Sequence, residues 1–267
     1  MFRFILPILL FPILSFAQTA ASKKAIQDSI IKKYLENGAW KYSYLSPKWG
    51  EWIDKGLKED STIAYLWQQK AMPLFKQRKY ELGMESLNRA VCYDTAWLDY
   101  RGFMKCIFVK NYQDAIADLQ LSKRHIPSGR VMDHSYDFYL ALCYLQLNQF
   151  DLALEKLKLI TDQNLKEKGE SWQHPVELFY LGVAYMEGGQ TDLALATFDR
   201  ALVIYPKFAD ARYYKGICLG RKGDKENGLK LMDEAWIDFK AGYTINEDNV
   251  IYEPYPYQVN WKMLGHR

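Results

Sequence analysis

Residues 175–206 read PVELFYLGVAYMEGGQTDLALATFDRALVIYP, and this stretch decides the fold. Apolar and small residues recur in it at three- and four-residue steps on both sides of Gly188-Gly189, which predicts two helices with one apolar face each. These faces comprise Leu178, Leu181, Gly182 and Tyr185 before the turn, and Ala194, Phe198 and Ala201 after it. Because a lone two-helix hairpin cannot bury its apolar surface, the sequence predicts copies of the hairpin on either side.

The copies are found by aligning the small residue near the start of each second helix. That residue is Gly83, Ala115, Ala153, Ala194 and Gly228 in successive units. Four residues later each unit has a large apolar side chain, namely Leu87, Leu119, Leu157, Phe198 and Met232. The spacing varies from 32 to 41 residues because of two insertions, at Ser128 to Asp133 and at about Ile160 to His174. For the second insertion a longer helix followed by a loop is favoured over a partner contact through Trp172.

This period resembles the tetratricopeptide repeat, in which a Trp, Leu-Gly, Tyr, Ala, Phe, Ala, Pro series recurs every 34 residues. The central unit matches best, with Leu181-Gly182, Tyr185, Ala194, Phe198, Ala201 and Pro206. The resemblance implies an all-α fold, a right-handed superhelical solenoid of TPR-like helix-turn-helix repeats. The expected organisation is a signal peptide at 1–17, an N-terminal helical cap at 18–62, about five repeats at 63–240, and a Tyr/Pro-rich extension at 241–267.

Residues 1–17 have the pattern of a secretory signal peptide. Arg3 precedes an apolar run from Phe4 to Leu14, and Ser15-Phe16-Ala17 offers small residues before a cut. The run is too short for a membrane span and contains two prolines, so removal after Ala17 is predicted in preference to a retained anchor. We therefore expect an exported protein, periplasmic or secreted, with no stable membrane span after signal removal.

The charge balance and the cysteines of the sequence point to no special class of partner or site. Lys and Arg number 35 against 32 Asp and Glu, which makes no case for nucleic acid. The four Cys, at 92, 106, 143 and 218, lack CxxC spacing and are interpreted as small buried apolar residues, although pairing of two in an exported protein stays open.

No catalytic constellation is present in the sequence. The four His, at 125, 134, 174 and 266, fall in predicted turns or at the tail and form no HExxH pair, so we expect them to be solvated. No phosphate loop or nucleophile elbow occurs. The chain is therefore expected not to be an enzyme, and neither a metal site nor a cofactor is predicted.

The remaining kind of function is recognition of a partner through the protein surface. The family resemblance implies a concave wall lined by the first helix of each repeat. Its usual positions fall here on Tyr100, Arg101, Phe138, Tyr139, Phe179, Tyr180, Tyr213 and Tyr214. We expect one member of each pair to pack between units and the other to face the groove. An aromatic wall suits a protein partner or an extended apolar or proline-rich peptide.

The extension offers a second occupant for this groove. Its segment Tyr252 to Tyr257 is stiffened by Pro254 and Pro256, and Tyr252, Tyr255 and Tyr257 are costly to leave in water. Our hypothesis is that this tail docks in the groove in cis. An open cleft would favour an exported scaffold that binds its partner in the groove. A groove filled by the tail would favour the alternative, a mainly architectural solenoid with contacts on its convex face.

Overall fold

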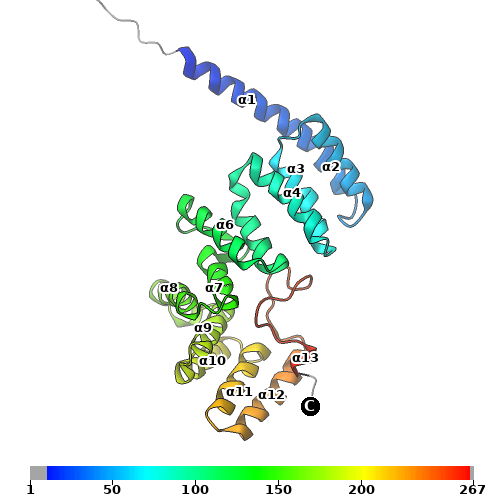
Figure 1. Cartoon of the computed structure of the whole chain (residues 1–267). Coiled ribbons are helices and arrows are strands. Elements are labelled where there is room, and N and C mark those ends of the chain that lie inside the picture. The colour runs from blue at the N-terminus through cyan, green and yellow to red at the C-terminus, as the bar shows by residue number, and fades with distance from the viewer. Residues whose placement is uncertain (1–10, 265–267) are drawn as a thin grey trace, which may run out of the picture. The chain divides into compact units, whose positions relative to one another are not determined.

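The structure is a computed structural model that describes the backbone of residues 11–264 and the side chains of residues 21–264 (Figure 1). The described chain is helical apart from one two-stranded hairpin and its connections. None of its described helices is both long and apolar enough to be a candidate membrane span. The chain divides into two compact units between Thr95 and Ala96.

The first unit contains a cap and one helical hairpin. Its apolar core gathers Leu35, Ala39, Ile53 and Leu66, all with fully buried side chains. Trp49 is also buried and donates its indole N–H to the Gln69 carbonyl, 3.0 Å away. Its elements are α1 (Phe11–Ile31), the π-helix η1 (Lys32–Glu36), the 3₁₀ turn η2 (Ala39–Lys41), α2 (Pro47–Glu59), α3 (Ala64–Lys76) and α4 (Tyr80–Tyr93).

The second unit contains four helical hairpins in succession and an extended C-terminal segment. Within each hairpin the two helices pack on each other, and the second helix also packs on the first helix of the next hairpin. The 3₁₀ turn η3 (Thr95–Trp97) leads into it. Its elements are α5 (Leu98–Met104), η4 (Lys105–Val109), α6 (Tyr112–His125), β1 (Arg130–Val131), β2 (His134–Ser135), α7 (Tyr136–Gln146), α8 (Phe150–Lys168), η5 (Glu170–Trp172), α9 (Pro175–Glu187), α10 (Thr191–Ile204), α11 (Ala209–Arg221), α12 (Lys225–Lys240) and α13 (Trp261–Leu264).

All five hairpins make the turn between their helices in the same way. The residue five positions before the small register residue has a positive φ in every unit, with values from 58° to 94°. These residues are Arg78, Lys110, Asn148, Gly189 and Gly223. Two of the five are Gly and one is Asn, the residue types that take this left-handed conformation most readily at a helix C-terminus, and Arg78 and Lys110 adopt it in the equivalent turns.

Small residues lie where the two helices of a hairpin pack closely. A Cβ atom added at Gly182 on α9 would lie 2.5 Å from Phe198 Cε1 on α10. Phe198 is fully buried, as are Ala194 and Ala201 on the same helix. The alternation of small and large residues read from the sequence is therefore the packing of one helix against the next.

The two insertions add local structure. Residues 130–135 form an antiparallel hairpin in which Val131 pairs with His134, and α8 continues to Lys168 before a short 3₁₀ turn. Trp172 in that turn is exposed, at 72% of its surface. The four Cys are free; Cys92 is exposed, contrary to the expectation that all are buried, and the other three are buried. The predicted fold class, all-α with TPR-like helical hairpins, is confirmed.

Candidate functional site: the inner wall and the C-terminal segment

The predicted wall residues lie in pairs on α5, α7, α9 and α11, the first helices of the second unit's hairpins. We call this set the inner wall. The expectation of an open member in each pair is wrong for α7 and α9, whose aromatic side chains are all fully buried. On α11, Tyr214 is buried and Tyr213 half-buried, and on α5 both Tyr100 and Arg101 are half-buried.

The first member of each central pair packs between hairpins, as expected. Phe138 on α7 lies with its ring centroid 5.5 Å from that of Tyr180 on α9, and Phe179 on α9 lies 5.7 Å from Tyr214 on α11. Each of these aromatics thus contacts the second member of the next pair. The wall is a ladder of rings that ties successive hairpins together.

The C-terminal segment, residues 243–260, lies against this wall (Figure 1). Tyr180 donates its hydroxyl proton to the Pro256 carbonyl at 2.7 Å, and Tyr257 places its ring 5.9 Å from that of Tyr214. Tyr255 is 3% exposed. Burial, and next the Tyr255 phenol, raise the pKa of Tyr139 well above its ordinary value. The second members of the α7, α9 and α11 pairs, Tyr139, Tyr180 and Tyr214, therefore face the chain's own tail.

The outer part of the tail is held less closely. Tyr252 is half-buried, and the Pro254 carbonyl accepts a hydrogen bond from Lys110 Nζ at 2.7 Å. Lys110 is the left-handed turn residue between the helices of the second hairpin, and burial lowers the pKa of its ammonium. The tail thus reaches from the first hairpin of this unit to its last.

Asp210 anchors both ends of the C-terminal segment. This carboxylate, in the first turn of α11, is fully buried. Its Oδ2 accepts hydrogen bonds from Thr244 Oγ1 at 2.7 Å and Ile245 N at 3.0 Å, and its Oδ1 accepts one from Val259 N at 2.8 Å. A single buried carboxylate therefore satisfies two backbone N–H groups that lie fourteen residues apart.

Arg101, the basic residue of the wall, already has a partner. Its guanidinium binds both carboxylate oxygens of Asp118 on α6, at 2.7 and 2.8 Å, and Lys105 Nζ lies 2.7 Å from the same carboxylate. Asp118 is buried. This bidentate pair fastens the two helices of one hairpin.

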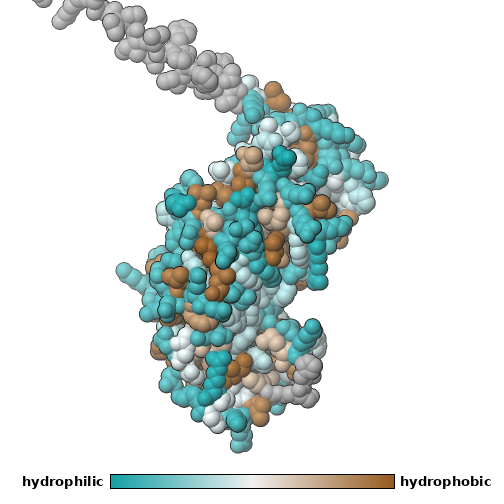
Figure 2. Space-filling model, viewed as in Figure 1, coloured by the Kyte–Doolittle hydropathy of each residue, from teal (hydrophilic) through white to brown (hydrophobic). Residues whose placement is uncertain are grey.

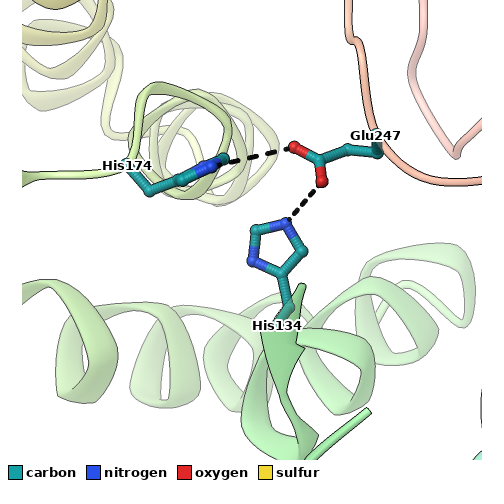
Figure 3. A group of neighbouring side chains, drawn as sticks. All are labelled: His134, His174 and Glu247. Carbon is teal, nitrogen blue, oxygen red and sulfur yellow. Dashed lines mark hydrogen bonds and ion pairs between the residues drawn. The ribbon is translucent and has the colours of Figure 1, made fainter. Parts of the chain in front are cut away.

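The expectation that the histidines are solvated is wrong for His134. His134 on β2 is 1% exposed and stacks on the Phe138 ring, whereas His125 is exposed and His266 lies outside the described residues. His134 Nδ1 lies 3.2 Å from Glu177 Oε1 on α9, and Nε2 lies 3.0 Å from Glu247 Oε2 in the C-terminal segment. His174, at the N-cap of α9, lies with Nε2 4.0 Å from Glu247 Oε1 (Figure 3).

The charges of this cluster follow from burial and from these contacts. Burial alone would lower the pKa of His134, but the hydrogen bonds to Glu177 and Glu247 outweigh it, so the pKa is raised. Burial alone would raise the pKa of Glu247, but the hydrogen bond from His134 lowers it. Burial, and then the neighbouring His134, lower the pKa of His174. The cluster thus places one buried imidazole between two buried carboxylates.

Sequence reasoning missed Asp210, His134, Glu177 and Glu247. Asp210 looks like an ordinary acidic residue in a first helical turn, which the helix dipole favours in any case. Glu247 lies beyond the last repeat, so the spacing of the repeats does not predict which residues it contacts. One signal for His134 was available, the insertion before α7. This insertion forms the hairpin of residues 130–135, which places His134 against Glu177 on α9.

Comparison with known proteins agrees with this architecture. Residues 179–239 match the family model for the tetratricopeptide repeat. Among curated proteins, the chain is 27% identical over 140 residues to "Inactive peptidyl-prolyl cis-trans isomerase shutdown" of Bombyx mori. That match covers 51% of this chain and 30% of the relative, so the chain spans under a third of its length.

Several solved structures share the fold. PilW, a type IV pilus biogenesis factor, superposes with a TM-score of 0.59 at 16% identity, covering 80% of this chain and 94% of PilW. MamA from Desulfovibrio magneticus RS-1 gives 0.54 at 16% identity, covering 67% and 96%. YrrB, a TPR protein with an unusual peptide-binding site, gives 0.51 at 21% identity, covering 71% and 93%.

Proposed function

Because this chain carries tetratricopeptide repeats, we propose that it is a scaffold that binds a protein partner, and that the partner contacts the outer face formed by its second helices. The observation that carries the proposal is the occupied inner wall. The buried Tyr180 hydroxyl is bonded to Pro256, and Tyr139 and Tyr214 are buried as well. A partner that used this wall would first have to displace the C-terminal segment.

The outer face of the second helices offers apolar side chains at repeating positions. Leu152 on α8 and Leu193 on α10 both stand one residue before the register residue, and both are exposed. Val203 on α10 and Ile237 on α12 both stand nine residues after it, at 79% and 62% exposure. Figure 2 shows apolar side chains in separate groups among hydrophilic ones on the face it presents. Recurrent exposed apolar side chains on adjacent hairpins suit contact with a protein.

Site-specific photocrosslinking tests this assignment. A benzophenone side chain at Val203 or Ile237 is expected to trap a partner in intact cells, because these side chains lie on the outer face. The same probe at Tyr213, half-buried on the inner wall, is expected to trap none. With the trapped protein identified and purified, Val203→Asp combined with Ile237→Asp should weaken its binding at least about tenfold, the loss of roughly 1.4 kcal/mol.

Two outcomes would contradict the outer-face proposal. One is crosslinking at Tyr213 alone, accompanied by release of the C-terminal segment, since that pattern belongs to a partner that displaces the tail. The other is unchanged affinity in the double aspartate variant. Substitution of Tyr180 and Tyr214 is not a selective test of the wall, because both are buried and their removal would leave cavities.

We further propose that the protein is exported. Support comes from the charged and apolar pattern of residues 1–17 alone; residues 1–10 lie outside the described part, and residues 11–17 fall within α1. N-terminal sequencing of the protein purified from its native host is expected to begin at Gln18. Fractionation should recover it outside the cytoplasm. A chain that retains Met1 and fractionates with cytoplasmic enzymes would refute export.

A further inference from the structure

The cluster of His134, His174 and Glu247 has the composition and arrangement of a metal site. One ligand atom from each lies within 4.8 Å of the others. His134 and Glu247 are 113 residues apart in the sequence, and both are buried where they meet. Figure 3 shows the imidazole rings of His134, on β2, and of His174, at the N-cap of α9, both directed at the Glu247 carboxylate. No metal site was predicted from the sequence, because none of the three residues lies near another along the chain.

A second carboxylate fixes the orientation of one ring. Glu177 lies against His134 Nδ1, and its other oxygen accepts a hydrogen bond from Asn164 Nδ2 at 2.9 Å. Both ring nitrogens of His134 lie within hydrogen-bond distance of a carboxylate. When a metal ion replaces the proton on Nε2, Nδ1–H still donates to Glu177 and the Nε2 lone pair faces the ion beside Glu247. Metal-binding histidines usually donate the N–H of the nitrogen that does not bind the metal to a carboxylate, a backbone carbonyl or a water, and Glu177 supplies the carboxylate here.

His174 contributes a nitrogen with no other partner. Its Nδ1 is buried and has no hydrogen-bond partner among the described residues, and its Nε2 lies 4.0 Å from Glu247 Oε1. A buried polar nitrogen normally has a partner, so this one needs an explanation. A bound ion would give Nδ1 a partner once the His174 ring turned to bring this nitrogen, in place of Nε2, toward Glu247.

We propose that His134, His174 and Glu247 bind a divalent transition-metal ion, zinc by the chemistry of its ligands, and that this ion fastens the C-terminal segment to the inner wall. Two imidazole nitrogens and one carboxylate oxygen are a ligand set that suits zinc. In a tetrahedral zinc site, neighbouring ligand atoms lie about 3.3 Å apart. The His134 Nε2–Glu247 Oε2 distance is 3.0 Å and the His174 Nε2–Glu247 Oε1 distance is 4.0 Å, so a side-chain rotation would bring these ligand atoms to that spacing.

The proposed ion has a free coordination position. The His174 side chain is 44% exposed, whereas those of His134 and Glu247 are buried, so the cluster opens to solvent on the His174 side. A water molecule would complete the tetrahedron there. The charges around the cluster agree with a cation, since Glu247 belongs to it and Glu177 lies against the other ring nitrogen of His134.

Isothermal titration of the tag-free, chelator-treated full chain with zinc chloride tests the proposal. One ion per chain is expected to bind with micromolar or tighter affinity, and cobalt(II) is expected to give the visible absorption of a tetrahedral site. His174→Ala and Glu247→Gln should each weaken binding at least about 30-fold, because each removes one of three protein ligands. His125→Ala is the matched control: it removes an exposed histidine from the same unit and should leave binding unchanged.

Hydrogen exchange tests whether the ion fastens the segment. Saturating zinc should slow amide exchange in residues 243–260 about tenfold or more in the wild type and leave it unchanged in His174→Ala. Absence of saturable binding, or wild-type binding by both variants, would overturn the metal site and leave an ion-paired latch of His134 with its two carboxylates. Binding without slower exchange would overturn the fastening role. His174 is only partly buried, so its variant tests the site even where His134 variants fail to fold.

Discussion

Replacement of Asp210 by alanine is expected to release the C-terminal segment and to lower the free energy of unfolding by roughly 3 to 5 kcal/mol. The carboxylate is fully buried and accepts hydrogen bonds from Thr244, Ile245 and Val259. Without it, three donors lose their acceptor, and a buried unsatisfied donor costs about 1 to 3 kcal/mol. Urea unfolding measures the loss. Amide exchange in residues 243–260 should accelerate at least about 100-fold.

Asp199→Ala is the matched control. Asp199 lies on α10 and is ion-paired with Lys215 at the surface, where its side chain is 56% exposed. Loss of an exposed pair should cost less than about 1 kcal/mol and leave exchange in the C-terminal segment unchanged. If Asp210→Ala proved as mild as this control, the segment would be held by its tyrosines and not by the buried carboxylate.

The pH dependence of stability should carry the signature of the same residue. Burial raises the pKa of Asp210 to about 6, against hydrogen bonds that lower it. The folded state then holds the Asp210 carboxyl proton more tightly than the unfolded chain does. The contribution of this tighter proton binding to the free energy of unfolding is therefore fully present below about pH 4 and is lost as the pH rises through 6. The stability difference between wild type and Asp210→Ala should therefore widen by up to about 3 kcal/mol from pH 7 to pH 4. A difference that narrows over this range would mean that the hydrogen bonds outweigh burial.

The helical hairpins could be predicted from the sequence because their determinants are local. Apolar residues at helical spacing, and a small residue opposite a large one, recur in each unit, and each recurrence strengthens the assignment. The turns could be placed but not described. Arg78, Lys110 and Asn148 take the left-handed conformation that Gly189 and Gly223 take in other units. Asn148 is of a type that often takes this conformation, whereas Arg78 and Lys110 rarely do, so their residue types do not indicate it.

The candidate site could be predicted only in part, because its contacts join distant segments. The tyrosines and prolines of the tail indicated a docked segment, and the aromatic pairs indicated the helices it would meet. The groups that hold it were not indicated. Asp210, His134 and Glu247 are unremarkable at their own positions, and their roles arise from pairings such as the one that joins residues 113 apart. Periodicity cannot report contacts of that kind.

Replacement of Gly216 by alanine is expected to lower the free energy of unfolding by about 3 kcal/mol, although alanine is the better helix former. An added Cβ would lie 2.7 Å from the Gly228 carbonyl oxygen, and one added at Gly228 would lie equally close to the Gly216 carbonyl. These obstacles are backbone atoms that no side-chain rotation can move. The helices α11 and α12 would have to separate, and overpacking of this kind costs about 1 to 3 kcal/mol or more.

Gly220 supplies the control for that prediction because it lies on the same helix, one turn later. An added Cβ there would meet no atom within 4 Å. Gly220→Ala should therefore stabilise the protein by about 0.5 kcal/mol through helix propensity alone. Urea unfolding of both variants gives the two values with opposite signs. Equal and small effects would mean that α11 and α12 can move apart without a loss of free energy of unfolding. The last hairpin would then tolerate a wider spacing, and the close approach of two glycines would not be what joins its helices.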